Sequence, residues 1–178
     1  WAGNALLKQQ IMSGDFEAAL RTLENNRTAG LLSKEAASRK RAVLLTAQAM
    51  AEEQAHPDRA AKLAVQAHKL APGLVPAAIV GATAHARLND LKRAAAMLET
   101  VWKKEPHPDI AATYVHLRHG DSGLDRLKRA RKLASMRYGH PQGAMAVAEA
   151  AMAAHAWEAA REAMKPPPLA NPTQRACT

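Results

Sequence analysis

Three stretches of the chain repeat one order of small, polar and large apolar residues. Residues 14–23 read GDFEAALRTL, residues 89–98 read NDLKRAAAML and residues 155–164 read HAWEAAREAM. In each stretch a small or polar pair precedes a bulky apolar residue, an Ala follows at the sixth position, and a large apolar residue stands four positions later. A pattern that recurs along the chain predicts one structural unit used several times. Such a unit favours an extended binding surface over a single catalytic pocket.

Equivalent positions of this pattern lie 34 residues apart, since Ala60 matches Ala94 and Pro72 matches Pro106. This spacing is the period of a helix–turn–helix repeat. The apolar periodicity and the prolines that end the pattern predict an all-α chain of about five helix pairs. The predicted pairs are 2–12 with 16–27, 35–53 with 58–70, 75–87 with 90–104, 109–118 with 124–137, and 141–153 with 156–165.

The turns between paired helices have the residues that such turns need. Gly14 and Gly120 can take positive φ where a helix ends. Acidic side chains at the following position can accept hydrogen bonds from the free amides of the next helix. These predicted caps are Asp15, Asp90 and Asp121.

Small residues in the middle of the predicted helices mark the places where two helices come close. These residues are Ala19, Gly81, Ala82, Ala94 and Ala148. Large apolar residues one turn later are expected to fill the layer between the helices. They are Leu23, Leu98 and Met164, and we expect Trp102 and Trp157 to pack in the core as well.

Composition agrees with closely packed helices. Hydrophobic residues make up 48% of the chain, but Ala supplies much of this and aromatic residues only 3%. Sheet is therefore unlikely, because stretches rich in β-branched and aromatic residues are nearly absent. A single Cys, Cys177, excludes a disulfide framework and a cysteine metal site.

The order of these elements resembles the tetratricopeptide repeat (TPR). The third pair carries the resemblance best, through Gly81, Ala82, Asn89-Asp90, Ala94, Leu98 and Pro106. The fourth departs from it, because Arg129 stands where a small residue is expected. The resemblance implies a right-handed superhelix over residues 1–165, with 166–178 as a proline-rich connection toward a further C-terminal segment.

Five longer stretches are similar to the cytoplasmic helical region of the HemY family, bacterial tetratricopeptide proteins associated with haem biosynthesis. They read GDFEAALRTLE, RAAKLAVQAHKLAPGLVPAAIVGA, RAAAMLETVWKKEPHPDIAATYVHLR, RLKRARKLA and PPPLANPTQRAC. The resemblance implies a protein scaffold on the cytoplasmic face of the inner membrane, whose partners are haem-biosynthetic or other inner-membrane proteins. The chain begins at Trp1 and not at Met, so we expect the N-terminal membrane anchor of the family to lie outside it.

No catalytic constellation or phosphate-cradling loop stands out, so we expect neither enzymatic activity nor a cofactor. An alternative is direct haem or porphyrin binding, because four histidines gather around the fourth pair. They are His107, His116, His119 and His140, with His116 or His119 as the candidate ligand. Their spacing matches no known metal or haem motif, which favours ordinary surface histidines.

A basic segment covers residues 118–137, where seven Arg or Lys and two Asp give +5 of the net charge of +9. Leu124, Leu127, Ala130, Leu133 and Ala134 predict the buried stripe of this helix. The opposite face should then display Arg126, Lys128, Arg129 and Lys132 to solvent. This basic face is either simply solvated or contacts anionic lipid or an acidic partner. Nucleic acid is not expected, because aromatic residues for base stacking are missing.

In the tetratricopeptide family the first helix of each pair lines a concave groove. Carrying the family's inward positions onto this chain gives mixed polar and apolar side chains, which suit a peptide or helix ligand. The predicted groove residues are Glu52, Glu53, Thr83, Arg87, Thr113, Glu149 and Met152.

Overall fold

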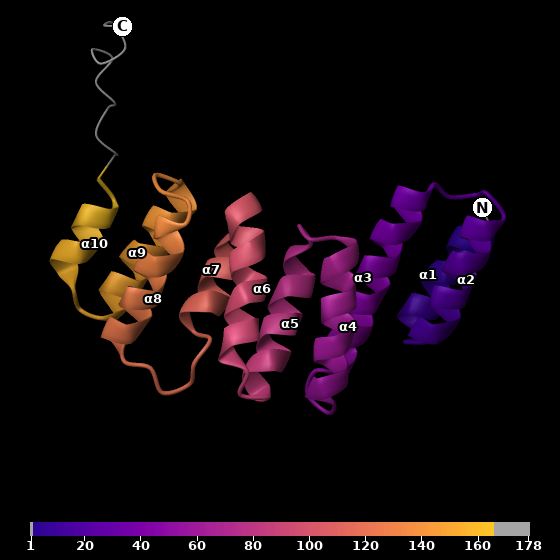
Figure 1. The fold of residues 1–178 in the computed structure, drawn as a ribbon, viewed down its shortest axis with the longest axis horizontal. Helices are drawn as coiled ribbons and strands as arrows, with labels where there is room; N and C mark the ends of the chain where they lie inside the picture. Colours follow the sequence, from indigo (N-terminus) through magenta and orange to yellow (C-terminus); the bar gives the residue numbers. More distant parts are fainter. Residues whose placement is uncertain (1, 166–178) are drawn as a thin grey trace, which may run out of the picture.

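The computed structural model describes residues 2–165, which form ten α-helices and no strand (Figure 1). The five helix pairs are α1 (Ala2–Met12) with α2 (Phe16–Thr28), α3 (Lys34–Glu52) with α4 (Pro57–Leu70), α5 (Val75–Arg87) with α6 (Leu91–Lys104), α7 (Pro108–Val115) with α8 (Gly123–Ser135), and α9 (Pro141–Ala153) with α10 (Trp157–Ala163). The prediction of an all-α chain is confirmed. The proline-rich connection predicted over 166–178, like Trp1 and Cys177, lies outside the described residues.

The helices pack in the order in which they follow along the chain, in an elongated row that runs in Figure 1 from α1 on the right to α10 on the left. Each helix packs on the next, as expected of a series of helical hairpins. The first helices of neighbouring pairs also contact one another, α3 with α5, α5 with α7, and α7 with α9. One side of the row is therefore built from these first helices.

The core confirms most of the predicted contact positions. Ala19, Ala94, Leu98 and Trp102 are fully buried, and Leu23 is nearly so. The largest apolar cluster surrounds Trp102 and joins helices α5 to α9. Its buried members are Ala78, Ala82, Ala94, Leu98, Val101, Trp102, Ile110, Ala111, Tyr114, Leu117, Leu133 and Ala146.

Three predictions of burial were wrong. Met164 and Trp157 are 61% and 58% exposed, because α10 is the last described helix and no following hairpin within residues 2–165 covers it. Leu124 is also exposed, although it stands only three residues before the buried Leu127 on α8.

The turns follow the predicted chemistry with one exception. Gly14 and Gly120 have φ of 75° and 81°, and Asn89 and His155 take positive φ at two of the three equivalent turns that have no Gly. Asp15 and Asp90 accept hydrogen bonds from amides of the helices that follow them, at 2.9 and 3.1 Å.

The exception is Asp121, which does not cap α8. The cap is Ser122, whose hydroxyl accepts from the Asp125 amide at 3.2 Å. The preceding helix, α7, ends three residues earlier than predicted, at Val115. Leu117 lies beyond this end and is buried in the main cluster. Regular helix therefore stops where Leu117 turns into the core.

Polar links between pairs repeat with the predicted period. Glu53 binds Arg87 at 3.5 Å, and these residues are 34 positions apart. Lys132 binds Glu99 at 3.1 Å across 33 positions. Arg137 donates to the carbonyl oxygen of Lys103, at the end of α6, at 2.8 Å across 34 positions. These polar side chains thus connect one helix pair to the next at intervals of 33 or 34 residues. This supports the 34-residue spacing from which the pairs were predicted.

Candidate functional site

The predicted groove residues do not line one common groove. Glu52 at the end of α3 binds Arg59 on α4 at 3.0 Å. Glu53 binds Arg87 at the end of α5, so these charged groups hold helix ends together. They are engaged within the chain.

Two threonines among the predicted groove residues are also engaged. The Thr83 hydroxyl donates to backbone carbonyls of its own helix, one turn earlier. The Thr113 hydroxyl donates in the same way to the Asp109 carbonyl at 2.7 Å. Such bonds within a helix satisfy the hydroxyl without a ligand.

Glu149 and Met152 on α9 are the two predicted groove residues that line hollows in the surface. Glu149 borders a small hollow of about 110 Å³ between α7 and α9. It also borders a wide cleft of about 1020 Å³ between α9 and α10, which Met152 lines as well. Because the two hollows share Glu149, they lie next to each other on either side of this side chain, and we call the two together the α7–α9–α10 surface.

The wide part of this surface is a terminal apolar cleft. Its large apolar side chains are 45–61% exposed and come from both helices. They are Met145, Met152, Trp157 and Met164. The helical pattern did not predict this cleft, because it assigned Trp157 and Met164 to the core. Both side chains are exposed because no further hairpin follows α10 within the described residues.

The small hollow has a different chemical character. Its walls are mostly alanines of α7 and α9, with His116 at the end of α7 and the Arg126 side chain from α8. The Arg126 Nε atom is buried and has no hydrogen-bond partner among the described residues. Arg126 was predicted to be displayed to solvent, and this was wrong. The side chain is half-buried and borders the hollow between α7 and α9.

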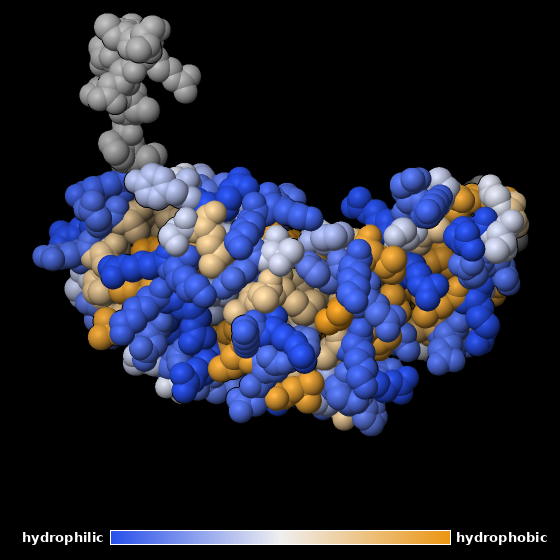
Figure 2. Space-filling view, in the orientation of Figure 1, coloured by the Kyte–Doolittle hydropathy of each residue, from blue (hydrophilic) through white to orange (hydrophobic). Residues whose placement is uncertain are grey.

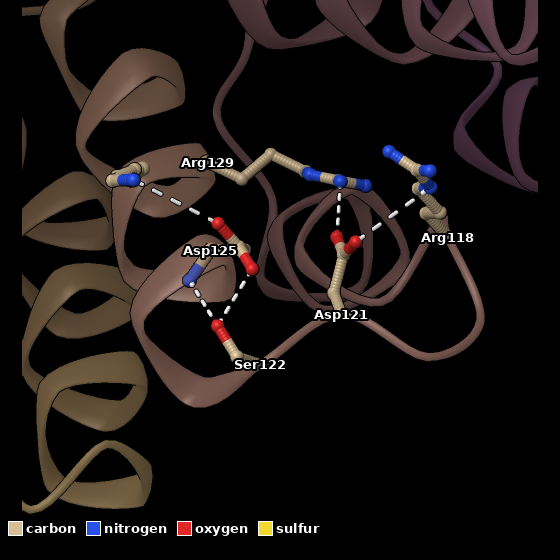
Figure 3. A network of polar contacts seen from close by, with 6 residues as sticks. Arg118, Asp121, Ser122, Asp125 and Arg129 are labelled. Carbon is tan, nitrogen blue, oxygen red and sulfur yellow. Dashed lines mark hydrogen bonds and ion pairs between the residues drawn. The ribbon is translucent and has the colours of Figure 1, made fainter.

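The rest of the predicted basic face is largely neutralised. Arg118 and Arg129 both approach the carboxylate of Asp121, whose side chain is only 7% exposed (Figure 3). Arg129 is itself mostly buried, so it does not lie on a solvated face as predicted. Lys128 binds Asp125 at 3.8 Å. The hydrogen bond from Ser122, drawn in Figure 3, lowers the pKa of the Asp125 carboxyl.

Lys132, the last member of the basic face, belongs to a network across three helices. Glu99 of α6 accepts hydrogen bonds from the Tyr114 hydroxyl at 2.7 Å and from Lys132 at 3.1 Å. Burial acts to raise the pKa of Glu99, but these two hydrogen bonds and the charges of Lys132 and Lys103 together hold that pKa below its usual range. Burial and the bond to Glu99 raise the pKa of Tyr114. With Lys128, Arg129 and Lys132 all paired, the basic face has little charge left for an anionic surface.

The four histidines around the fourth pair have separate local roles. His107 and His140 cap α7 and α9, because their Nδ1 atoms accept from backbone amides at 3.2 Å. His116 borders the small hollow, and His119 is exposed in the turn that follows. Within residues 2–165, no three His, Cys, Asp or Glu side chains are grouped as a metal site.

A further hollow of about 680 Å³ opens at the upper edge of the molecule, between the start of α3 and the end of α6. Figure 2 shows it as a notch above the connection between α4 and α5. Its lining mixes Lys34 and Arg39 with Glu35 and Glu105. Because charges of both signs line this notch, it favours no one class of ligand.

Comparisons with protein-family models, with curated proteins and with solved structures found no match to this chain. None of the helices within residues 2–165 has the length and apolar composition that spanning a bilayer requires.

Proposed function

We propose that this chain is a tetratricopeptide-like solenoid, wound as a right-handed superhelix, that acts as a scaffold for other proteins and has no catalytic activity. The α7–α9–α10 surface carries the proposal. It places the small hollow that contains Arg126 beside an apolar cleft on adjacent helices. Aromatic and Met side chains like those of the cleft are enriched where proteins bind one another. An exposed apolar patch rimmed by polar residues is typical of an interaction site.

The resemblance to the HemY family extends this proposal. The scaffold would be held at the cytoplasmic face of the bacterial inner membrane by an anchor outside this chain. Its partners would be proteins of haem biosynthesis or other proteins of that membrane. The sequential packing of hairpins and the 33- to 34-residue links between pairs support the repeat architecture that this family implies.

Direct haem binding through His116 or His119 has less support. The hollow beside His116 has a volume of about 110 Å³. Cofactor and drug-sized ligands usually occupy pockets of roughly 300–1,000 Å³. We therefore do not propose a haem site at these histidines.

Photo-crosslinking in the native membrane tests the scaffold. A photo-reactive amino acid placed at Met152 of the full-length protein should capture one defined partner, identified by mass spectrometry. The matched control is the same amino acid at Lys62, an exposed position on α4 outside the α7–α9–α10 surface. Equal capture from both positions, or none from either, would contradict the proposal, whereas capture of a haem-biosynthetic protein at Met152 alone would support it.

A further inference from the structure

The two hollows of the α7–α9–α10 surface differ in chemical character, and this difference indicates what kind of partner segment would bind there. Met145, Glu149 and Met152 form a ridge along α9, since residues three and four apart share one face of a helix. On one side of this ridge lies the small hollow with Arg126, and on the other lies the terminal apolar cleft. A ligand that lies along the cleft therefore reaches the Arg126 hollow by crossing the Glu149 side chain.

The charges around this surface favour an acidic ligand. Arg126 borders the small hollow and Arg161 borders the cleft, and neither forms an ion pair with a described residue. By contrast, Arg118 in the turn before α8 and Arg129 on α8 both pair with Asp121. Lys165, also at the cleft, is paired with Glu162 at 2.6 Å. Glu149 supplies one negative charge between the two guanidinium groups, so the surface retains an excess of positive charge.

Arg126 is the most specific part of this surface. A buried nitrogen without a hydrogen-bond partner costs free energy, which a suitable ligand atom would recover. A carboxylate fits, because a guanidinium presents parallel N–H groups to two carboxylate oxygens. The hollow of about 110 Å³ has room for such a group, since a water molecule takes about 30 Å³ in the liquid.

The apolar cleft determines which apolar side chains the ligand needs. Three Met side chains and Trp157 offer an adaptable apolar lining, and Met-rich surfaces can repack around apolar anchors of different shape. The cleft lies between two antiparallel helices. In this row, each of α5, α7 and α9 packs on the pair before it, so a further first helix would pack into this cleft. An amphipathic helix fits such a groove through anchors at positions i, i+3 or i+4, and i+7.

We propose that the α7–α9–α10 surface binds an acidic amphipathic helix of a partner protein. Its apolar face lies in the cleft formed by Met145, Met152, Trp157 and Met164, and one of its carboxylates occupies the hollow at Arg126. This proposal names the partner class of the scaffold and rests on the proposed function.

Binding of labelled synthetic peptides to the whole chain tests the proposal by fluorescence anisotropy. One peptide carries Leu at helical spacing with Glu on its polar positions, and a second replaces each Glu by Gln. The Glu peptide should bind about tenfold more tightly, as expected for charge-assisted bonds to guanidinium groups. This preference should shrink with added salt.

Variants separate the two halves of the site. Arg126→Gln should remove the preference for the Glu peptide while binding of the Gln peptide persists. Met152→Ser should weaken both peptides by the same factor, because it removes an apolar contact that they share. Arg39→Gln changes an arginine at the distant upper notch and should alter neither affinity. Arg161→Gln, at an exposed position, provides a second test of charge if Arg126→Gln fails to fold.

Equal affinity for the two peptides would overturn the inference, and so would a preference that survives in a folded Arg126→Gln variant. If Arg126→Gln does not fold, a preference that survives in Arg161→Gln would overturn it. Absence of binding by either peptide would also overturn it, while the crosslinking result at Met152 would still decide the scaffold function. Self-association of the chain, abolished by Met152→Glu in sedimentation, would show that a second copy fills the cleft and would overturn the assignment to a partner.

Discussion

Burial lowers the pKa of two histidines, His68 on α4 and His85 on α5. The nearby charge of Lys104 lowers the pKa of His68 further. For His85, Arg93 also acts to lower the pKa, while Asp90 acts to raise it without reversing the effect of burial. Both side chains are therefore held neutral in the fold at pH values where an unfolded chain already takes up protons.

This effect predicts a loss of stability in mild acid. The unfolded state binds protons below about 6.5, whereas the folded state resists them until its lower pKa is reached. Stability due to these histidines is complete above the unfolded pKa and is lost as the pH falls through the folded pKa. Each can change the free energy of unfolding by at most about 1.4 kcal/mol per pH unit.

Urea unfolding at several pH values between 7.5 and 5 measures this loss. The double variant His68→Gln with His85→Gln should show a flatter dependence in this range, which lies above the ordinary pKa of carboxyl groups. An unchanged slope in the double variant would mean that other groups titrate there.

At the scale of helices, glycines set how closely two elements approach. A Cβ atom added at Gly123, the first residue of α8, would lie 2.9 Å from the Cα of Ala154, at the end of α9. A Cβ at Gly81 on α5 would lie 2.5 Å from the Cε of Met97 and 3.0 Å from the Cβ of Ala64. The first obstacle is backbone, whereas the nearest atom in the second case is the flexible end of a side chain.

The two glycines should therefore respond differently to alanine. Gly123→Ala should lower the free energy of unfolding by about 1–3 kcal/mol, the usual cost of overpacking. Gly81→Ala should cost less, because Met97 can move aside and Ala improves helix propensity by about 1 kcal/mol. Gly73→Ala serves as the control, since nothing lies within 4 Å of its added Cβ. Equal losses at positions 81 and 123 in urea unfolding would contradict this explanation.

Across the whole molecule, burial decreases from the middle toward both ends. Helices α5 to α9 share the cluster around Trp102, whereas α10 has no buried residue and is only seven residues long. Near the other end, Leu7 of α1 belongs to a small cluster with Ala19, Leu23 and Leu44. In an array where each unit contacts only its neighbours, such ends open more readily than the middle.

Hydrogen exchange measures this gradient directly. Amides of α10 should exchange first, those of α1 and α2 next, and those of α5 and α6 last, at a rate set by global unfolding. Leu98→Ala, in the middle cluster, should cost about 2–5 kcal/mol and speed exchange in the protected helices. Uniform protection from α1 to α10 would instead indicate one cooperative unit.

The all-α series of helix pairs could be predicted from the sequence because its signals are local. Ala60 and Ala94 gave the period, and Asp15 and Asp90 gave two helix caps that the structure confirms. The candidate site depends on contacts that no local pattern contains. Asp121 was predicted to cap a helix, but its carboxylate pairs with two arginines. Trp157 was predicted to lie in the core, but it is exposed. The ion pairs of Asp121 and the exposure of Trp157 both depend on which elements pack next to the helix. The spacing of residues along the sequence does not reveal those neighbours.

The links between pairs have a consequence for folding. Glu53 with Arg87, Glu99 with Lys132, and Lys103 with Arg137 each join residues 33 or 34 positions apart. No side-chain hydrogen bond or ion pair among the described residues spans more. Each link thus closes a loop of nearly one length, and its entropic cost does not grow as pairs are added. Chains with such local contacts fold quickly for their size. Formation of structure can therefore begin at any hairpin and spread in both directions, one pair at a time.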